Sequence, residues 1–156
     1  MFDVPLDAWY SWIGLALAGV ALLGVVSSLP TTPPPDANAV ANTVDRLAAG
    51  DHVATAEHPL DASAVKLGPH RVSLRNDAGT VHAAYAFGPV TPVADGSALQ
   101  RVLYGQPPST VFESERAFHQ AVVEARTREP TWETVDRTLV VRRVSWGETD
   151  VTLVDA

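Results

Sequence analysis

The chain has 156 residues, and its eleven Lys and Arg stand against 18 Asp and Glu, which gives a formal net charge of -7. This length supports one folded domain with an appendage, and the acidic balance opposes nucleic-acid binding. Cysteine is absent, which excludes disulfides, thiolate metal sites and cysteine nucleophiles.

The first predicted element is a membrane-spanning helix over residues 9–29, which carry no charged side chain. A helix of this length reaches about 31 Å, close to the roughly 30 Å hydrocarbon core of a bilayer. Trp9, Tyr10 and Trp12 lie at its start, where aromatic rings favour the lipid headgroups, and Pro30 ends it. The segment predicts a single-pass protein of the cell membrane, with the lipid bilayer as its partner.

A cleaved signal peptide is the main alternative for this segment. Such a signal begins with basic residues, whereas the first seven residues, MFDVPLD, contain Asp3 and Asp7 and neither Lys nor Arg. A buried soluble helix needs a larger core than this chain can supply. Because the first basic residue is Arg46, the positive-inside rule says little about orientation. The acidic N-terminus and the proline-rich tether favour an extracytoplasmic domain.

Small side chains recur along one face of the predicted membrane helix, at alternating spacings of three and four. Small residues let two transmembrane helices approach closely. The stripe therefore indicates a partner helix or self-association, unless it arises by chance in a segment rich in Gly and Ala. The predicted packing stripe consists of Ser11, Gly14, Ala18, Ala21, Val25 and Ser28.

Residues 30–36 read PTTPPPD and predict a stiff, extended spacer between the membrane segment and a domain over residues 37–156. Asp36 is a suitable N-cap for a helix over 37–49, and Gly50 follows as a stop signal. The apolar face of this helix consists of Val40, Val44 and Leu47, with Ala37, Ala41 and Ala48 beside them.

From residue 52 the hydrophobic period changes to two, which is typical of strands. The segments RVSLR and TVHAAYAF flank NDAGT, and this pattern predicts a hairpin, after which GPVTPV ends the sheet. One face of the predicted hairpin carries Val72, Leu74, Val81, Ala83, Tyr85 and Phe87, and the other carries Arg71, Ser73, Arg75 and His82.

The rest of the chain predicts two helices followed by two strands. SALQRVLYG reads as a short helix, and Thr110 and Glu113 have capping-box spacing before a helix over about 113–127. TLVVRRVSWGETDVTLV reads as two strands around Gly147–Glu148. The expected buried positions are Leu99, Val102, Leu103, Phe118, Ala121, Val122, Ala125, Val140, Val144, Val151 and Leu153. The fold class is therefore α+β, with an N-terminal transmembrane helix before a small domain of antiparallel β hairpins packed with two or three helices.

No residue that carries chemistry stands in a catalytic or binding motif. The histidines form no HxH or HExxH pattern, the serines no GxSxG elbow and the glycines no phosphate loop. His52, Glu57 and His58 are interpreted as strand-edge surface, and Glu113 and Glu115 as carboxylates favoured at a helix start. We expect no catalytic residue, no cofactor site and no metal site.

Two residue pairs have the chemistry for recognition. Arg142 and Arg143 are adjacent in a predicted strand, so they point to opposite faces, and one is placed to pair with a carboxylate across the following turn. Trp132 and Trp146 are interpreted as core residues, with exposed ligand platforms as the alternative.

Five stretches of the chain resemble a group of uncharacterised haloarchaeal membrane-anchored proteins: MFDVPLDAWY, SSLPTTPPPDANAVANTVDRLA, EHPLDASAVKLGPHRVSL, AFGPVTPV and PTWETVDRTLVVRRVSWGETDVTLVDA. This resemblance implies no activity and no site residues. An N-terminal helix before a small α+β domain is also similar to archaeal pilin-like and secretion-system subunits. A prepilin has a basic residue and a glycine before its helix, whereas this chain has PLDAWYSW, so this similarity implies an unprocessed accessory component.

These expectations lead to the hypothesis of a non-enzymatic, single-pass membrane protein whose extracytoplasmic domain serves interaction or assembly. One alternative is a membrane-tethered ligand-binding or sensory domain, which a pocket with converging polar groups would favour. Another is an enzyme whose site is assembled from scattered residues, which a cleft holding titratable side chains of perturbed pKa would favour.

Overall fold

The computed structural model describes residues 6–27, 32–135 and 138–156, with side chains from Trp9 onward. The chain divides into two compact units, Met1–Pro33 and Pro34–Ala156, and the second is called the head below. The first contains the helix α1 (Leu6–Ser27). The head contains the helices α2 (Ala37–Ala48), α3 (Ala98–Leu103), α4 (Pro108–Val111) and α5 (Glu115–Thr127) and the strands β1 (Ala54–Pro59), β2 (Ala64–Leu67), β3 (Arg71–Asn76), β4 (Gly79–Ala84), β5 (Thr91–Pro92), β6 (Glu133–Thr134), β7 (Thr138–Trp146) and β8 (Thr149–Asp155).

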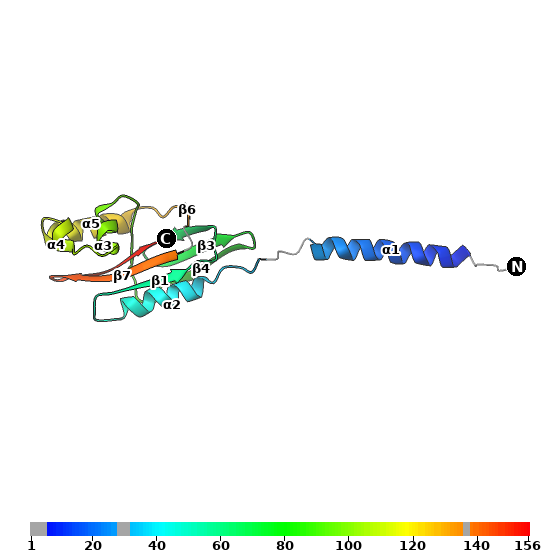
Figure 1. Cartoon of the computed structure of the whole chain (residues 1–156), viewed down its shortest axis with the longest axis horizontal. Helices are drawn as coiled ribbons and strands as arrows, with labels where there is room; N and C mark the ends of the chain where they lie inside the picture. The colour runs from blue at the N-terminus through cyan, green and yellow to red at the C-terminus, as the bar shows by residue number, and fades with distance from the viewer. Residues whose placement is uncertain (1–5, 28–31, 136–137) are drawn as a thin grey trace. The chain divides into compact units, whose positions relative to one another are not determined.

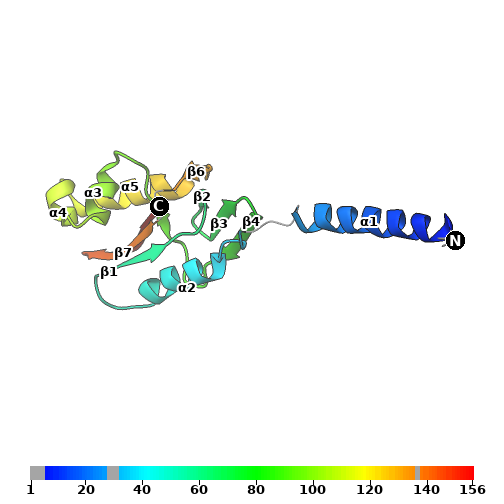
Figure 2. The same ribbon diagram turned by 45° about the vertical axis from the view of Figure 1, so that its right-hand side comes forward.

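The strands of the head form two sheets, and one of these lies between two hydrophobic cores (Figures 1 and 2). The first sheet has the order β1-β7-β8-β5 and the second β4-β3-β2-β6. Because side chains alternate along a strand, Leu139 and Val141 of β7 enter one core and Val144 enters the other. The head is thus three layers: α3 and α5, the first sheet, and α2 with the second sheet. The predicted α+β class is confirmed.

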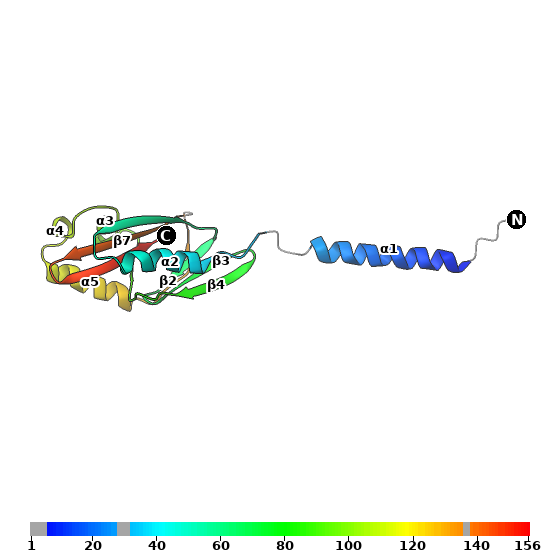
Figure 3. The same ribbon diagram turned by 90° about the horizontal axis from the view of Figure 1, so that it is seen from below.

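Helix α2 packs against strands of both sheets, as Figure 3 shows from below. Its predicted N-cap is confirmed, since the Asp36 carboxylate accepts a hydrogen bond from the Ala39 amide at 3.0 Å. Val40 and Val44 are buried, as predicted. At its other end, the Asp45 carboxylate accepts hydrogen bonds from the amides of Ala86 and Phe87, each at 3.0 Å. The helix therefore also holds the segment that leaves β4.

That contact explains one difference from the predicted hairpin. β3 and β4 pair as expected, with Asn76 opposite Gly79 around a two-residue turn, and Gly79 has a φ of 138°. However, β4 ends at Ala84, and the Phe87 side chain is 56 % exposed rather than inward. Asp45 binds the amides of residues 86 and 87, which diverts the backbone from the strand direction before Phe87.

Two further expectations are wrong in detail. The segment GPVTPV does not simply end the sheet, because Thr91 and Pro92 form β5, which pairs parallel to β8. The longer helix begins at Glu115 and not at 113, since the Ser114 hydroxyl accepts from the Ala117 amide at 3.2 Å. Thr110 lies instead in α4, which Pro108 begins at a position where proline is favoured.

Candidate functional site

The outer face of the second sheet carries the polar side chains of the β2–β3–β4 strands. Lys66 lies opposite Ser73 and Ser73 opposite His82, so these three side chains form a row across the sheet. Arg71 and Arg75 flank Ser73 on the same face. The alternate residues of these strands are buried in the first core, while Ser73 is buried between its neighbours in the row and His82 is exposed. Apart from Phe87, the predicted division of the hairpin faces is confirmed.

A groove runs over this row and is called the outer groove. It has a volume of about 430 Å³, within the roughly 300–1,000 Å³ typical of small-molecule sites. Its lining residues come from β2, the β2–β3 turn, β3, β4 and the segment before β6: Lys66, Gly68, Pro69, His70, Arg71, Ser73, Thr80, His82, Pro130 and Trp132.

Trp132 forms one wall of the outer groove and is fixed there by Arg75. The Arg75 guanidinium carbon lies 4.1 Å from the centre of the Trp132 ring, in a cation–π contact. The Arg75 Nε also donates to the Thr80 Oγ1 at 3.2 Å. Trp132 lies outside both cores, so its interpretation as a core residue is wrong, whereas Trp146 packs on Phe118 with ring centres 5.9 Å apart.

The electrostatics of the outer groove differ from the rest of this acidic chain. None of its ten lining residues is Asp or Glu, whereas four further pockets of the described residues each include at least one. Lys66 is the one lysine of the sequence. Within the described residues, the side chains of Lys66, His70, Arg71 and His82 have neither a hydrogen-bond partner nor a carboxylate partner. The groove therefore presents two cationic side chains, Lys66 and Arg71, that have no partner among the described residues.

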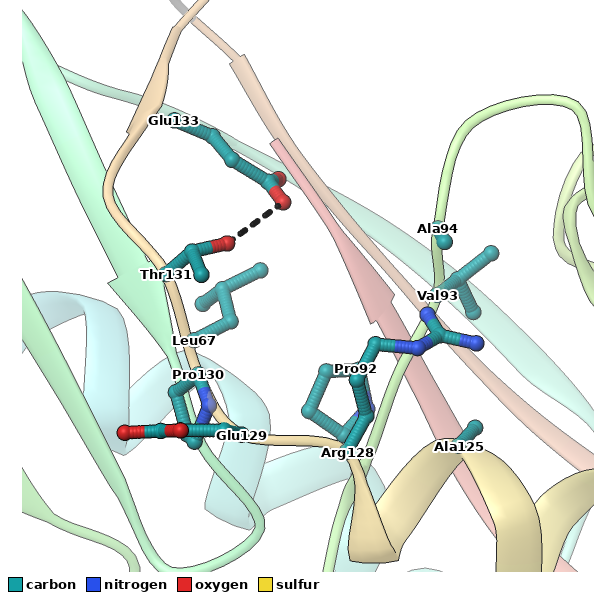
Figure 4. Close-up of a pocket in the computed structure, with 10 residues that line it drawn as sticks. All are labelled: Leu67, Pro92, Val93, Ala94, Ala125, Arg128, Glu129, Pro130, Thr131 and Glu133. Atoms are coloured by element: carbon teal, nitrogen blue, oxygen red, sulfur yellow. Dashed lines mark hydrogen bonds between the residues drawn. The ribbon is translucent and has the colours of Figure 1, made fainter.

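A second hollow lies beyond Pro130, which lines both (Figure 4). Its volume is about 40 Å³, little more than the roughly 30 Å³ that one water occupies in the liquid. In Figure 4 the Thr131 hydroxyl points to the Glu133 carboxylate, and this hydrogen bond is 3.4 Å long. The hollow is too small for an organic ligand.

One carboxylate of the head with a shifted pKa is Asp155, at the end of β8. It is 6 % exposed, and burial raises its pKa, partly offset by hydrogen bonds from the Gln100 side chain and the Ala156 amide. The charges of Asp95 and Glu133 raise the pKa further. The Gln100 Nε2 lies 3.3 Å from the Asp155 Oδ2. This contact joins α3 to the end of β8.

The pKa of Asp155 predicts a pH-dependent stability. A raised pKa means that the folded state holds this proton above pH 4, where the unfolded chain releases it, so stability falls as the pH rises through that window. Asp155→Asn retains an acceptor for Gln100 and removes the charge. We expect its melting temperature to exceed that of the unaltered protein at pH 7, with the difference vanishing below about pH 4. Thermal unfolding between these pH values checks this, and a gap independent of pH contradicts it.

Asp150→Asn is the matched control, since it removes the same charge from an exposed position of the same strand. We expect it to leave the pH dependence of the melting temperature unchanged.

The other residues considered from sequence serve packing and turn geometry. The His58 Nδ1 lies 3.0 Å from the Thr43 Oγ1, which links β1 to α2. Arg142 and Arg143 do point to opposite faces: Arg143 donates to the Ala48 carbonyl at 2.7 Å, and the Arg142 Nε is buried without a partner among the described residues. The expected pairing of one of them with a carboxylate across the turn is therefore not what the structure records. No group of three His, Cys, Asp or Glu in the described residues has metal-site geometry.

The predicted membrane residues lie on α1. Trp9, Tyr10 and Trp12 are exposed at its beginning, and the described members of the packing stripe face outward in the same helix. A Cβ added at Gly14 meets no atom within 4 Å, so that position leaves room for a neighbour. Ser28 and the last predicted residue, Leu29, lie outside the described residues. The stripe remains a prediction.

Trp9–Ser27 has the length and composition of a membrane span, with a mean hydropathy of 1.8 and none of its residues buried. A signal sequence near the N-terminus has the same properties, so length and composition fit a membrane anchor and a signal sequence equally. A family model matches residues 3–144, and its description is a family of unknown function, DUF7283. The chain belongs to this family. The match includes both α1 and most of the head, so the family combines them in one chain. Neither a curated protein nor a solved structure matches.

The outer groove was not predicted from the sequence, although two signals for it were present. Arg71, Ser73, Arg75 and His82 were correctly placed on one face, and the one lysine stood a few residues before them. What the sequence did not reveal is that Trp132, about sixty residues further along the chain, closes the same surface. The residues 130–134 reach it by pairing β6 with β2.

Proposed function

We propose that this chain is a single-pass membrane protein whose extracytoplasmic head recognises a ligand or partner without catalysing a reaction. The observation that carries the proposal is the 19-residue apolar span Trp9–Ser27 of α1, which precedes a head with two cores of its own. An apolar helix of this length matches the hydrocarbon core of a bilayer.

A recognition role is supported by the arrangement of the head. Several of its serine and histidine side chains serve helix caps and links between elements: Ser97 at α3, Ser114 at α5 and His58 at α2. The outer groove, in contrast, holds cationic and hydroxyl side chains around an aromatic wall. This feature favours the version of the proposal in which the head binds a ligand over one in which it serves assembly alone.

The finer parts of the proposal rest on the sequence. The resemblance to haloarchaeal proteins and the net charge of -7 support a haloarchaeal origin. The succession of an apolar helix and a small α+β head supports an accessory role beside a pilus-like or secretion assembly. The small-residue stripe of α1 supports a second helix, or a second copy of the chain, as a partner in the bilayer.

Membrane extraction tests the anchor. We expect the full chain to sediment with membranes and to resist carbonate and high salt, because α1 is held by lipid and not by charge. A chain that begins at Asp36 lacks α1 and should be soluble. Recovery of a mature chain from the medium that begins near Leu29 would instead establish a cleaved signal and overturn the anchor.

Protease treatment of intact cells tests the orientation. If the head is extracytoplasmic, added protease removes the epitope of a C-terminal tag while a cytoplasmic marker survives. Full protection of the tag in intact cells, with digestion only after lysis, would place the head inside.

A further inference from the structure

We propose that the outer groove binds a small organic anion in which a phosphate or carboxylate group is attached to a flat ring. This inference rests on the recognition role proposed above and gives it a ligand class. It does not depend on the side of the membrane on which the head lies.

The charges of the groove favour an anion. Lys66 and Arg71 lie on one face of the sheet, and the row that joins β2 to β4 adds His82. Among the described residues, no Asp or Glu lines the groove, although the sequence holds 18 of them. A guanidinium and an ammonium that have no partner in the described residues can each donate to the oxygens of one acidic group, and such charge-assisted hydrogen bonds are stronger than neutral ones.

The remaining lining residues favour a ring on the ligand. Trp132, Pro69 and Pro130 supply apolar walls, and the guanidinium of Arg75 holds the Trp132 ring in place. An aromatic wall fixed before binding loses little freedom when a flat ring packs against it. Ser73 and Thr80 lie on the floor and rim, where their hydroxyls can serve polar substituents.

The size of the groove and the charge of the chain favour a small ligand over a polyanion. About 430 Å³ accommodates a molecule of drug size. A nucleic acid or an anionic polymer extends beyond the groove and meets the repulsion of a chain with a net charge of -7. A small ligand with one acidic group experiences mainly the local field of Lys66 and Arg71.

Calorimetric titration of the full chain in nanodiscs of phosphatidylcholine tests the proposal, because this neutral lipid offers no anionic headgroup as a competitor. The probes are phenyl phosphate, inorganic phosphate and benzyl alcohol. We expect phenyl phosphate to bind more tightly than inorganic phosphate and benzyl alcohol not to bind. A site with a dissociation constant of 1 mM would be almost filled at about 10 mM phenyl phosphate. If no binding is detected up to that concentration, the proposal is wrong. If phenyl phosphate and inorganic phosphate bind with equal affinity, the proposed contact with a ring is wrong. If benzyl alcohol binds as tightly as phenyl phosphate, the proposed requirement for an anionic group is wrong.

Variants locate the binding site. Lys66→Gln with Arg71→Gln should weaken phenyl phosphate binding by at least about tenfold, as expected for the loss of charged hydrogen bonds. Trp132→Leu should lower the affinity for phenyl phosphate to the level of the affinity for inorganic phosphate. The affinity for inorganic phosphate itself should not change. The matched control is Arg101→Gln with Arg116→Gln, which changes the net charge equally at exposed positions of α3 and α5.

An equal loss in the control pair would show that overall charge, and not the groove, attracts the anion, and would overturn the proposal. Membrane extraction of the same variants separates this outcome from failure of the anchor, since each variant should sediment as the unaltered chain does. If the full-length chain is soluble and still binds phenyl phosphate, the binding proposal is supported and the membrane-anchor proposal is wrong.

Discussion

Phe118→Ala should lower the free energy of unfolding of the head by about 3–5 kcal/mol, the cost of truncating a buried aromatic residue. Phe118 is fully buried at the centre of the second core, with its ring centre 5.4 Å from that of Phe112 and 5.9 Å from that of Trp146. Alanine would leave a cavity between α5 and the first sheet that neither neighbour can fill without leaving its own contacts. Urea unfolding of residues 34–156, followed by tryptophan fluorescence, measures the loss.

Val123→Ala is the control for this prediction, because Val123 is 44 % exposed on the same helix. It shortens an apolar side chain of α5 without opening a core cavity, so we expect a change within about 0.5 kcal/mol. If both variants lose similar stability, α5 does not pack on the sheet as described.

Gly147→Ala should cost about 2–4 kcal/mol, from two sources that can be separated. Gly147 has a φ of 61°, a left-handed conformation that costs a residue with a Cβ roughly 1–2 kcal/mol. In addition, the new Cβ would collide with the Glu115 carboxylate. That carboxylate accepts from the Glu148 amide at 2.7 Å and the Thr149 hydroxyl at 3.2 Å, and both bonds would be lost. Denaturant unfolding measures the total.

Gly96→Ala is the matched control, since Gly96 has a φ of 70° and an added Cβ there meets no atom within 4 Å. It should show the conformational cost of roughly 1–2 kcal/mol alone. Removing the carboxylate first, with Glu115→Ala, should reduce the effect of Gly147→Ala to that of Gly96→Ala. An undiminished effect in that background would mean that Glu115 does not lie over the turn.

The sequence predicted the elements whose patterns are local. The N-cap Asp36, the turn before Gly79 and the strands around Gly147 each depend on a few neighbouring residues, and all were confirmed. The predicted cap of α5 was wrong, because Thr110 lies in α4 and the N-cap is Ser114, directly before the first residue of α5.

Features that join distant segments could not be predicted in this way. The parallel pairing of Thr91 with Leu153 and the contact of Asp45 with the amides after β4 depend on tertiary packing, which leaves no period in the sequence. The outer groove is of the same kind, since Trp132 contacts Arg75 and lines the groove with Lys66 through the pairing of β6 with β2. The polar face of the hairpin was visible beforehand, but its function as the wall of a cavity was not.

The position of α2 decides how the head bears mechanical load. The tether joins the head at Pro35, which is buried, and continues directly into α2. An edge strand pulled from its end can lose its hydrogen bonds one at a time. Helix α2, in contrast, contacts strands of both sheets, and its Asp45 carboxylate accepts hydrogen bonds from the backbone amides after β4. A pull on the chain before Pro35 would therefore act on α2 together with the strands of both sheets that it contacts, and not on a single edge strand.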